Sequence, residues 1–125
     1  MDRKKVLIVD DEDDIREVAI MSLEMTTGWE VLGARSGAEG LQKARTEKPD
    51  AVLLDVMMPV MDGPATLEKL RADPEIAGLP VVFLTAKVQA TDRRRLVELG
   101  AAGILAKPFD PMTLADQVKD VLGWK

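Results

Sequence analysis

The chain has 125 residues, which suits one domain of ordinary size. Its formal net charge of −5 argues against nucleic acid as the main ligand, because a phosphate backbone favours a basic surface. Without cysteine or histidine, the chain has no thiolate chemistry and lacks the commonest general base. Its apolar runs are far shorter than the roughly 20 residues of a membrane span. The N-terminus does not resemble a signal peptide, so we expect a cytoplasmic protein without a membrane partner.

Short apolar runs alternate with helical patterns along the whole chain. The apolar runs predict five strands, at residues 6–9, 30–34, 51–55, 81–85 and 103–106. The helical patterns predict helices, cap residues included, at residues 14–25, 36–46, 64–71, 91–100 and 110–122. Ser36 followed by Glu39 is a capping-box pattern. Asp110 before Pro111 predicts the cap and first residue of the last helix.

The composition of the central strands predicts the fold class. The runs at 6–9, 51–54 and 81–84 are apolar throughout and do not alternate with polar residues. Strands buried on both faces have this composition, which is typical of a parallel sheet with helices on each side. We therefore predict an α/β fold, with a doubly wound five-stranded parallel sheet in a single domain over residues 1–125.

Charged and polar residues follow four of the five predicted strands. Asp10 and Asp11 follow the first strand, Asp55 ends the third, Thr85 ends the fourth, and Lys107 follows the fifth. In such sheets the ligand site lies beyond the carboxyl ends of the strands. Crowded carboxylates without histidine or cysteine suit Mg²⁺, which prefers hard oxygen ligands. A lysine and a hydroxyl beside them suit a phosphoryl group carried on a carboxylate.

Four motifs together resemble the receiver domain of bacterial two-component response regulators, of the CheY-like kind. They are VLIVDDEDD from residue 6, LLDVMMPVMDG from residue 53, VVFLTA from residue 81 and ILAKPF from residue 104. The resemblance covers essentially the whole chain, in order. It implies a flavodoxin-like sheet with strand order 2-1-3-4-5. It also implies a signalling domain that assists only its own phosphorylation and dephosphorylation.

The resemblance assigns a role to each residue at the strand ends. Asp55 matches the phosphoryl acceptor, and Asp10 and Asp11 match the acidic pair that binds Mg²⁺. The backbone carbonyl of Met57 matches the position that completes the metal site. The remaining matches are the switch hydroxyl (Thr85), the lysine that touches the phosphoryl group (Lys107) and the proline whose preceding peptide bond is usually cis (Pro108).

One position departs from the family pattern, and two others lie where the family varies and sets its rate of dephosphorylation. The second switch residue of the family is usually aromatic, and here it is Ile104. Met57 and Lys87 occupy the positions that tune dephosphorylation in the family. Neither is an acid or an amide that would orient an attacking water, so we expect slow self-hydrolysis. On the first helix, Ile20 and Met21 are predicted to lie off the apolar arc, as candidate contacts for a kinase. That arc comprises Ile15, Val18, Ala19, Ser22 and Leu23.

Other functions fit the sequence less well. A phosphatase of the haloacid dehalogenase type needs an acid two residues after its aspartate, where this chain has Met57. A P-loop protein needs a glycine-rich loop ending in Lys-Ser or Lys-Thr, which is absent. Taken singly, the acids at 10 and 11 are equally well explained as a helix cap. The alternative that stays open is a receiver-like interaction module that no longer cycles phosphate.

The expected partners follow from the resemblance. The phosphoryl donor is a histidine kinase or a phosphotransfer protein, since the chain has no histidine of its own. The output is either a separate downstream protein or a C-terminal output domain missing from this sequence, and neither choice is excluded. No direct contact with nucleic acid is expected for this domain.

Overall fold

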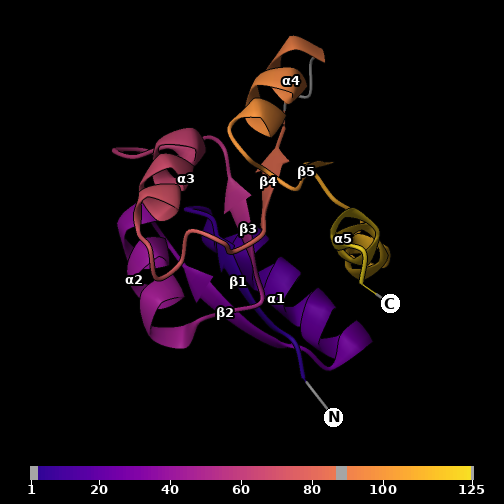
Figure 1. Cartoon of the computed structure of the whole chain (residues 1–125). Coiled ribbons are helices and arrows are strands. Elements are labelled where there is room, and N and C mark those ends of the chain that lie inside the picture. Colours follow the sequence, from indigo (N-terminus) through magenta and orange to yellow (C-terminus); the bar gives the residue numbers. More distant parts are fainter. Residues whose placement is uncertain (1–2, 87–89, 125) are drawn as a thin grey trace.

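The structure is a computed structural model that describes residues 3–86 and 90–124, with side chains for all of these except 90–92. Five strands alternate with five helices within these ranges (Figure 1). The strands are β1 (Lys5–Val9), β2 (Glu30–Ala34), β3 (Ala51–Asp55), β4 (Val81–Thr85) and β5 (Gly103–Ala106). The helices are α1 (Asp13–Thr27), α2 (Gly37–Glu47), α3 (Gly63–Ala72), α4 (Ala90–Glu98) and α5 (Leu114–Leu122).

The strands form one parallel sheet in the order β2-β1-β3-β4-β5. This order confirms the predicted doubly wound, flavodoxin-like fold. Four of the five strands have the predicted bounds, and β1 begins one residue earlier, at Lys5. The chain order reverses between β1 and β3, so the carboxyl ends of these two neighbouring strands lie at the topological switch point. Among the described residues, no helix is long and apolar enough to cross a bilayer.

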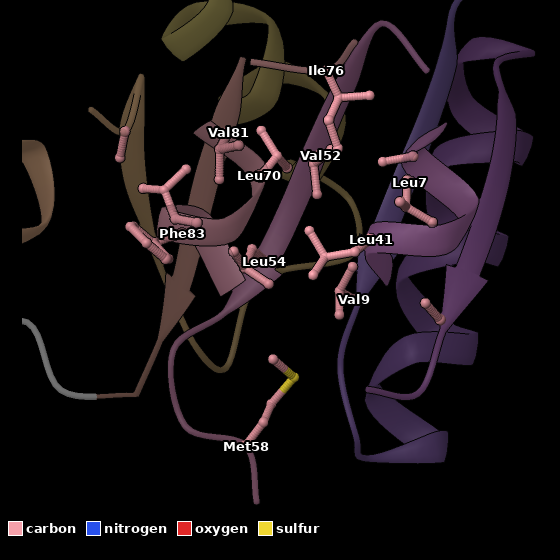
Figure 2. Packing of buried hydrophobic residues seen from close by; sticks show 14 of the residues in the cluster. Leu7, Val9, Leu41, Val52, Leu54, Met58, Leu70, Ile76, Val81 and Phe83 are labelled. Carbon is pink, nitrogen blue, oxygen red and sulfur yellow. The ribbon is translucent and has the colours of Figure 1, made fainter. Parts of the chain in front are cut away.

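The sheet is buried on both faces. One face packs against α2, α3 and α4 through a core cluster in which Leu7, Leu54 and Phe83 are fully buried (Figure 2). The other face packs against α1 and α5 through a second cluster that includes Ile8 and Leu53. Neighbouring residues of one strand therefore point into different cores, which explains why the central strands are apolar throughout.

Two helix starts follow the capping chemistry of the sequence. The Ser36 hydroxyl accepts a hydrogen bond from the Glu39 amide at 3.1 Å, as predicted. The Glu39 carboxylate turns back to the amide of Arg35 at 2.7 Å, one residue before the position that a capping box would use. Asp62 caps α3 by accepting from the Ala65 amide at 2.9 Å.

The predicted start of the last helix is wrong by three residues. α5 begins at Leu114, and residues 111–113 form a turn. The Asp110 carboxylate accepts a hydrogen bond from the amide of Met112 at 2.8 Å, two residues on. This local turn competes with the cap geometry that the Asp-Pro pair predicted. Thr113 precedes the helix instead and makes no capping bond with its side chain.

The predicted buried face of α1 is also wrong in part. Ile20 packs against the core, whereas Val18 is 43% exposed. The cause lies in β2, where an added side chain at Gly33 would approach the Ile20 methyl to 3.0 Å. The glycine leaves a hollow that Ile20 fills, so the apolar stripe turns towards β2. Met21 is 59% exposed, in agreement with its predicted position.

The loop between β3 and α3 contains a strained residue. Val60 has a φ of 69°, and its side chain is fully exposed. The amide of Met61 donates to the carbonyl of Pro59 at 2.8 Å, which closes a tight turn around Val60. A left-handed backbone is costly for a β-branched residue because its Cβ crowds the following carbonyl.

Val60→Gly is expected to stabilise the protein by about 0.5 to 1 kcal/mol. Removing a left-handed penalty of about 1 to 2 kcal/mol outweighs the greater chain entropy of glycine, which costs about 0.5 to 1 kcal/mol. No burial is lost, because the valine is exposed. Urea unfolding measures the difference. Val60→Ala retains a Cβ and should gain less, and a Val60→Gly protein of lower stability would contradict this account of the loop.

Candidate functional site

The carboxyl ends of the strands bring four predicted residues to one edge of the sheet. Asp10 follows β1 and is held there by a hydrogen bond from its amide to the carbonyl of Ala34, at 3.1 Å. Asp55 and Thr85 are the last residues of β3 and β4. The exposed fractions of Asp10, Asp55 and Thr85 are only 0%, 3% and 4%. Polar side chains this deeply buried require partners.

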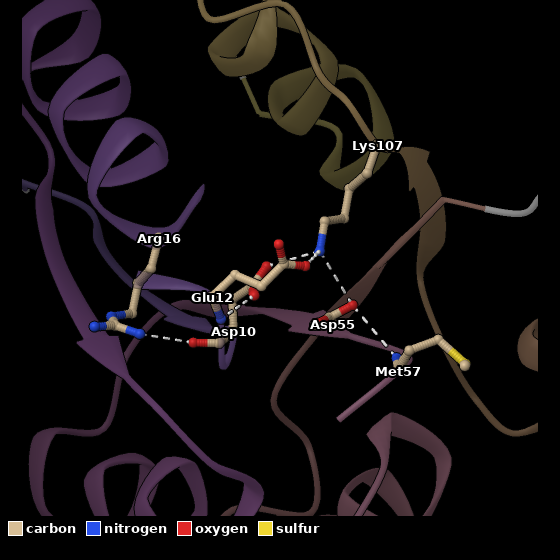
Figure 3. A network of polar contacts seen from close by, with 6 residues as sticks. All are labelled: Asp10, Glu12, Arg16, Asp55, Met57 and Lys107. Atoms are coloured by element: carbon tan, nitrogen blue, oxygen red, sulfur yellow. Dashed lines mark hydrogen bonds and ion pairs between the residues drawn. The ribbon is translucent and has the colours of Figure 1, made fainter. Parts of the chain in front are cut away.

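Lys107 is the positive partner of the buried acids. Its ammonium lies 3.0 Å from Asp10 Oδ2, 3.4 Å from Asp55 Oδ1 and 3.7 Å from Glu12 Oε1 (Figure 3). The Lys107 side chain is itself only 8% exposed. The contact with Asp10 is a hydrogen bond, and the contacts with Asp55 and Glu12 are longer ion pairs. The peptide bond between Lys107 and Pro108 is cis, as the family resemblance implied.

Two further residues at this edge, Glu12 and Arg16, were not predicted as site residues. Glu12 reaches Lys107 with its side chain, and its amide donates to Asp10 Oδ1 at 2.9 Å. Arg16 donates to the backbone carbonyl of Asp10 at 2.8 Å and pairs with Asp13 at 2.5 Å. The acidic run DDEDD was the signal for Glu12, but only the fold shows which of its members face Lys107. Arg16 lies on α1, one helical turn beyond the loop that it fixes (Figure 3).

A glycine in α3 makes room for the backbone of Asp55. A Cβ at Gly63 would lie 2.5 Å from the Asp55 carbonyl oxygen and 2.8 Å from the α-carbon of Val56. The Gly63 amide donates to the Val56 carbonyl at 2.9 Å, and the Val56 amide donates to Leu84 at 3.0 Å. The residue after the carboxylate is thus tied to both α3 and β4, which gives Asp55 a rigid base.

The two carboxylate oxygens of Asp55 have different surroundings. Oδ1 pairs with Lys107 and accepts a longer hydrogen bond from the Met57 amide, at 3.4 Å. Oδ2 is buried, and no described residue gives it a hydrogen bond. A cavity of about 250 Å³ opens beside the carboxylate and is lined by Glu12, Met57 and Lys107, among others. One oxygen is therefore held in place while the other lacks a protein donor.

Burial raises the pKa of the Asp55 carboxyl from 3.8 to about 6, and the negative charge of Asp10 adds to the effect. Lys107 opposes part of this rise. Burial of the Lys107 ammonium opposes its own charge, but the hydrogen bond to Asp10 and the charges of both aspartates outweigh burial and raise its pKa. The site therefore keeps its ammonium at neutral pH, beside more negative charge than that ammonium balances.

The acidic residues at this edge fit a divalent cation. Asp10, Asp11, Glu12 and Asp55 each offer an oxygen, and these atoms all lie within 4.8 Å of one another. The oxygen of Asp55 without a donor and the excess of negative charge both favour a bound cation. All of these ligands are hard oxygens, which suit Mg²⁺ better than a softer transition metal.

Of the remaining three predicted residues, the structure describes Met57 and Ile104. The Met57 side chain is 76% exposed, and the role of its backbone carbonyl as a metal ligand stays a prediction. Ile104 is partly buried against the core cluster and pairs with Phe83 across β4 and β5. Lys87, predicted to influence dephosphorylation, lies outside the described residues.

Asp55→Asn is expected to stabilise the metal-free protein above pH 6. The raised pKa means that the folded state holds the Asp55 proton more tightly than the unfolded state, so stability falls as pH rises from about 4 to about 6. Asparagine has no charge to bury and does not undergo this loss. The raised pKa already includes the opposing effect of Lys107, and it corresponds to an expected gain of about 3 kcal/mol at most.

Urea unfolding in EDTA at pH 4 and pH 7.5 measures this gain. The two proteins should differ little at pH 4, and the variant should be the more stable at pH 7.5. Asp120→Asn, which alters an exposed carboxylate on α5, is the matched control and should show no such gap. A variant less stable than the native protein at pH 7.5 would refute the raised pKa.

Comparison with known proteins agrees with this geometry. The family model described as the response regulator receiver domain matches residues 6–119. The alkaline phosphatase synthesis transcriptional regulatory protein PhoP of Bacillus subtilis is 41% identical over 95% of this chain. The probable transcriptional regulator ycf27 of Cyanophora paradoxa is 39% identical over 98% of it. The match covers 48% and 49% of these two proteins, so the chain spans about half the length of the curated relatives.

Solved structures show the same fold. The chemotaxis protein CheY4 of Vibrio cholerae is 34% identical with a TM-score of 0.89, and the match covers 96% of this chain and 99% of that one. A putative response regulator from Chloroflexus aurantiacus is 37% identical with a TM-score of 0.87, over 98% and 99% of the two chains. With its strand order, its acidic edge and these likenesses together, the chain belongs to the response regulator receiver domain family.

Proposed function

We propose that this receiver domain accepts a phosphoryl group on Asp55 from a phosphohistidine of a partner histidine kinase or phosphotransfer protein, in the presence of Mg²⁺. The observation that carries this proposal is the Asp55 carboxylate itself. It is almost fully buried at a strand end, faces a cavity and has one oxygen to which no described residue donates. Burying such a group reduces stability unless a bound ligand satisfies it, which favours a functional role over a structural one.

Different residues of the chain have different roles in phosphoryl transfer. An Asp55 oxygen forms a bond to phosphorus while the bond from phosphorus to the histidine nitrogen of the donor breaks. Lys107 lies within 3.4 Å of Asp55 Oδ1 and supplies a positive charge beside the incoming phosphoryl oxygens. Asp10, Asp11, Asp55 and the Met57 carbonyl would hold Mg²⁺, whose charge would neutralise the phosphoryl group. Positioning and charge balance, with no acid–base residue, suffice for this reaction.

The signal follows from new contacts with the phosphoryl group. Thr85 ends the strand next to Asp55, and its hydroxyl is the proposed switch that donates to a phosphoryl oxygen. Only contacts that differ between the two states can drive a conformational change. We expect the loop at 86–91 to carry this change, and residues 87–89 of that loop lie outside the described residues.

The proposed setting is a two-component pathway in the cytoplasm. Two of the relatives are named as transcriptional regulators, and the match covers about half of each. An output domain following this receiver in the same protein is therefore one route for the signal. A separate effector protein is the other route, since the match spans nearly all of the chemotaxis protein. The receiver itself meets neither nucleic acid nor membrane in this proposal.

Labelling with acetyl phosphate tests the acceptor. In millimolar Mg²⁺ the intact mass should rise by one phosphoryl group, and EDTA should abolish the rise. Asp55→Asn should not be labelled, because an amide is too weak a nucleophile. Asp120→Asn is the control and should be labelled like the native protein. Labelling of the Asp55 variant at the native rate would refute the acceptor assignment, whereas no labelling of the native protein would favour the interaction module.

Ile104 is expected to keep its rotamer on activation. An isoleucine has stiff χ1 preferences and no polar tip that favours solvent, unlike the aromatic residue usual in the family. It is already packed against the core cluster. Methyl NMR spectra with and without beryllofluoride should show a nearly constant Ile104 environment beside large amide shifts at 85–91. A changed Ile104 rotamer would show that the switch couples through this residue after all.

A further inference from the structure

The side chain of Met57 lies at the mouth of the acceptor site. It is 76% exposed and leads away from the Asp55 carboxylate in Figure 3. It lines the cavity of about 250 Å³ beside Asp55, and also a cavity of about 430 Å³ beside Thr85. A methionine side chain has three rotatable bonds. The exposed thioether can therefore turn towards either cavity.

The chemistry of sulfur in this chain is unusually simple. There are seven methionines and no cysteine, so an oxidant meets thioethers without competition from a thiolate. The neighbouring methionines differ sharply in access, since Met57 is 76% exposed and Met58 only 9%. Three other exposed methionines, at 21, 25 and 112, line a separate cavity on α1 and the turn before α5. Among the described methionines, Met57 is the exposed one that lines the cavity beside Asp55.

We propose that Met57 is a site of oxidation to the sulfoxide, and that this modification shortens the life of phosphorylated Asp55. The oxidant is a peroxide. A sulfur lone pair attacks one peroxide oxygen, an S–O bond forms as the O–O bond breaks, and the hydroxide released takes the proton of the new S–OH group to give water and the sulfoxide. The sulfur is oxidised by two electrons, and the peroxide is reduced by two. Sulfoxide reduction reverses the change, so the modification can act as a switch.

The expected effect on hydrolysis follows from the polarity of the new group, and it rests on the proposed acceptor role of Asp55. A thioether is a weak hydrogen-bond acceptor, whereas a sulfoxide carries a polar oxygen. Turned towards the cavity, that oxygen can accept a hydrogen bond from water and orient it towards phosphorus. The water oxygen then bonds to phosphorus, the bond to Asp55 breaks, and the carboxylate keeps the electron pair. The proton of the water leaves with inorganic phosphate.

The size of the effect is bounded by what a sulfoxide can do. A positioned acid–base group accelerates a reaction by a factor of about 100 to 10,000. A sulfoxide oxygen orients the water but does not take its proton. We therefore expect the phosphorylated lifetime to fall by a factor of about ten, below that range.

The first measurement detects the modification without any phosphorylation. The native protein is treated with hydrogen peroxide and digested, and the sulfoxide at each methionine is followed by peptide mass spectrometry. Met57 should oxidise at least about ten times faster than Met58, its adjacent buried control, because oxidation follows exposure. Equal rates at the two positions would overturn the proposed site.

The second measurement follows the lifetime of the phosphoryl group. The protein is labelled with acetyl phosphate, freed of the donor, and timed with and without peroxide treatment. Peroxide should shorten the lifetime about tenfold in the native protein. Met57→Leu keeps the other exposed methionines, and its phosphoryl group should have the same lifetime with and without peroxide treatment. Met57→Gln carries a polar oxygen and should decay faster than Met57→Leu without any oxidant.

The outcomes separate this inference from the acceptor assignment. A protein that is never labelled refutes the role of Asp55, whatever happens to Met57. A labelled protein whose lifetime is unchanged when Met57 is fully oxidised refutes the switch alone. A peroxide effect that persists in Met57→Leu would move the cause to another methionine and overturn the assignment to this residue.

Discussion

The ion pairs of Lys107 are the constraint on which the site depends. One ammonium faces two aspartates that are 0% and 3% exposed, at the edge where β1, β3 and β5 end. Removing the lysine would leave two buried carboxylates without their counter-charge, an arrangement that is strongly destabilising. Even with it, burial and the negative charge of Asp10 keep the pKa of Asp55 raised. The site is built to take up further positive charge.

The sheet makes this arrangement possible because it separates the apolar core residues from the charged residues of the site. Residues that fill the two cores lie along the strands, and the charged residues come only where the strands end. Gly63 lets α3 approach the backbone of Asp55, and Arg16 ties α1 to the backbone of Asp10. Both aspartates are thus fixed by neighbouring helices as well as by their strands, which keeps a repelling pair close together.

The sequence predicted the sheet and the site better than it predicted the helix faces. Apolar strands and the residues after them are local patterns, so the strand bounds and the places of Asp10 and Lys107 followed directly. The direction of Ile20 depends on a hollow at Gly33, which lies on another element. The start of α5 depends on a competing turn at Asp110. The reach of Glu12 to Lys107 spans nearly the whole chain, and no local pattern encodes it.

The three contacts of Lys107 also differ in how easily they break. Asp10 and Asp55 are buried, but the Glu12 side chain is 59% exposed and its contact is the longest, at 3.7 Å. An exposed ion pair contributes only about 0 to 1 kcal/mol. In the proposed function, a phosphoryl oxygen that takes a donor from Lys107 would therefore displace Glu12 at little cost. Glu12 stands at the start of α1, so this exchange would change the charge environment of that helix end while the buried pairs stay in place.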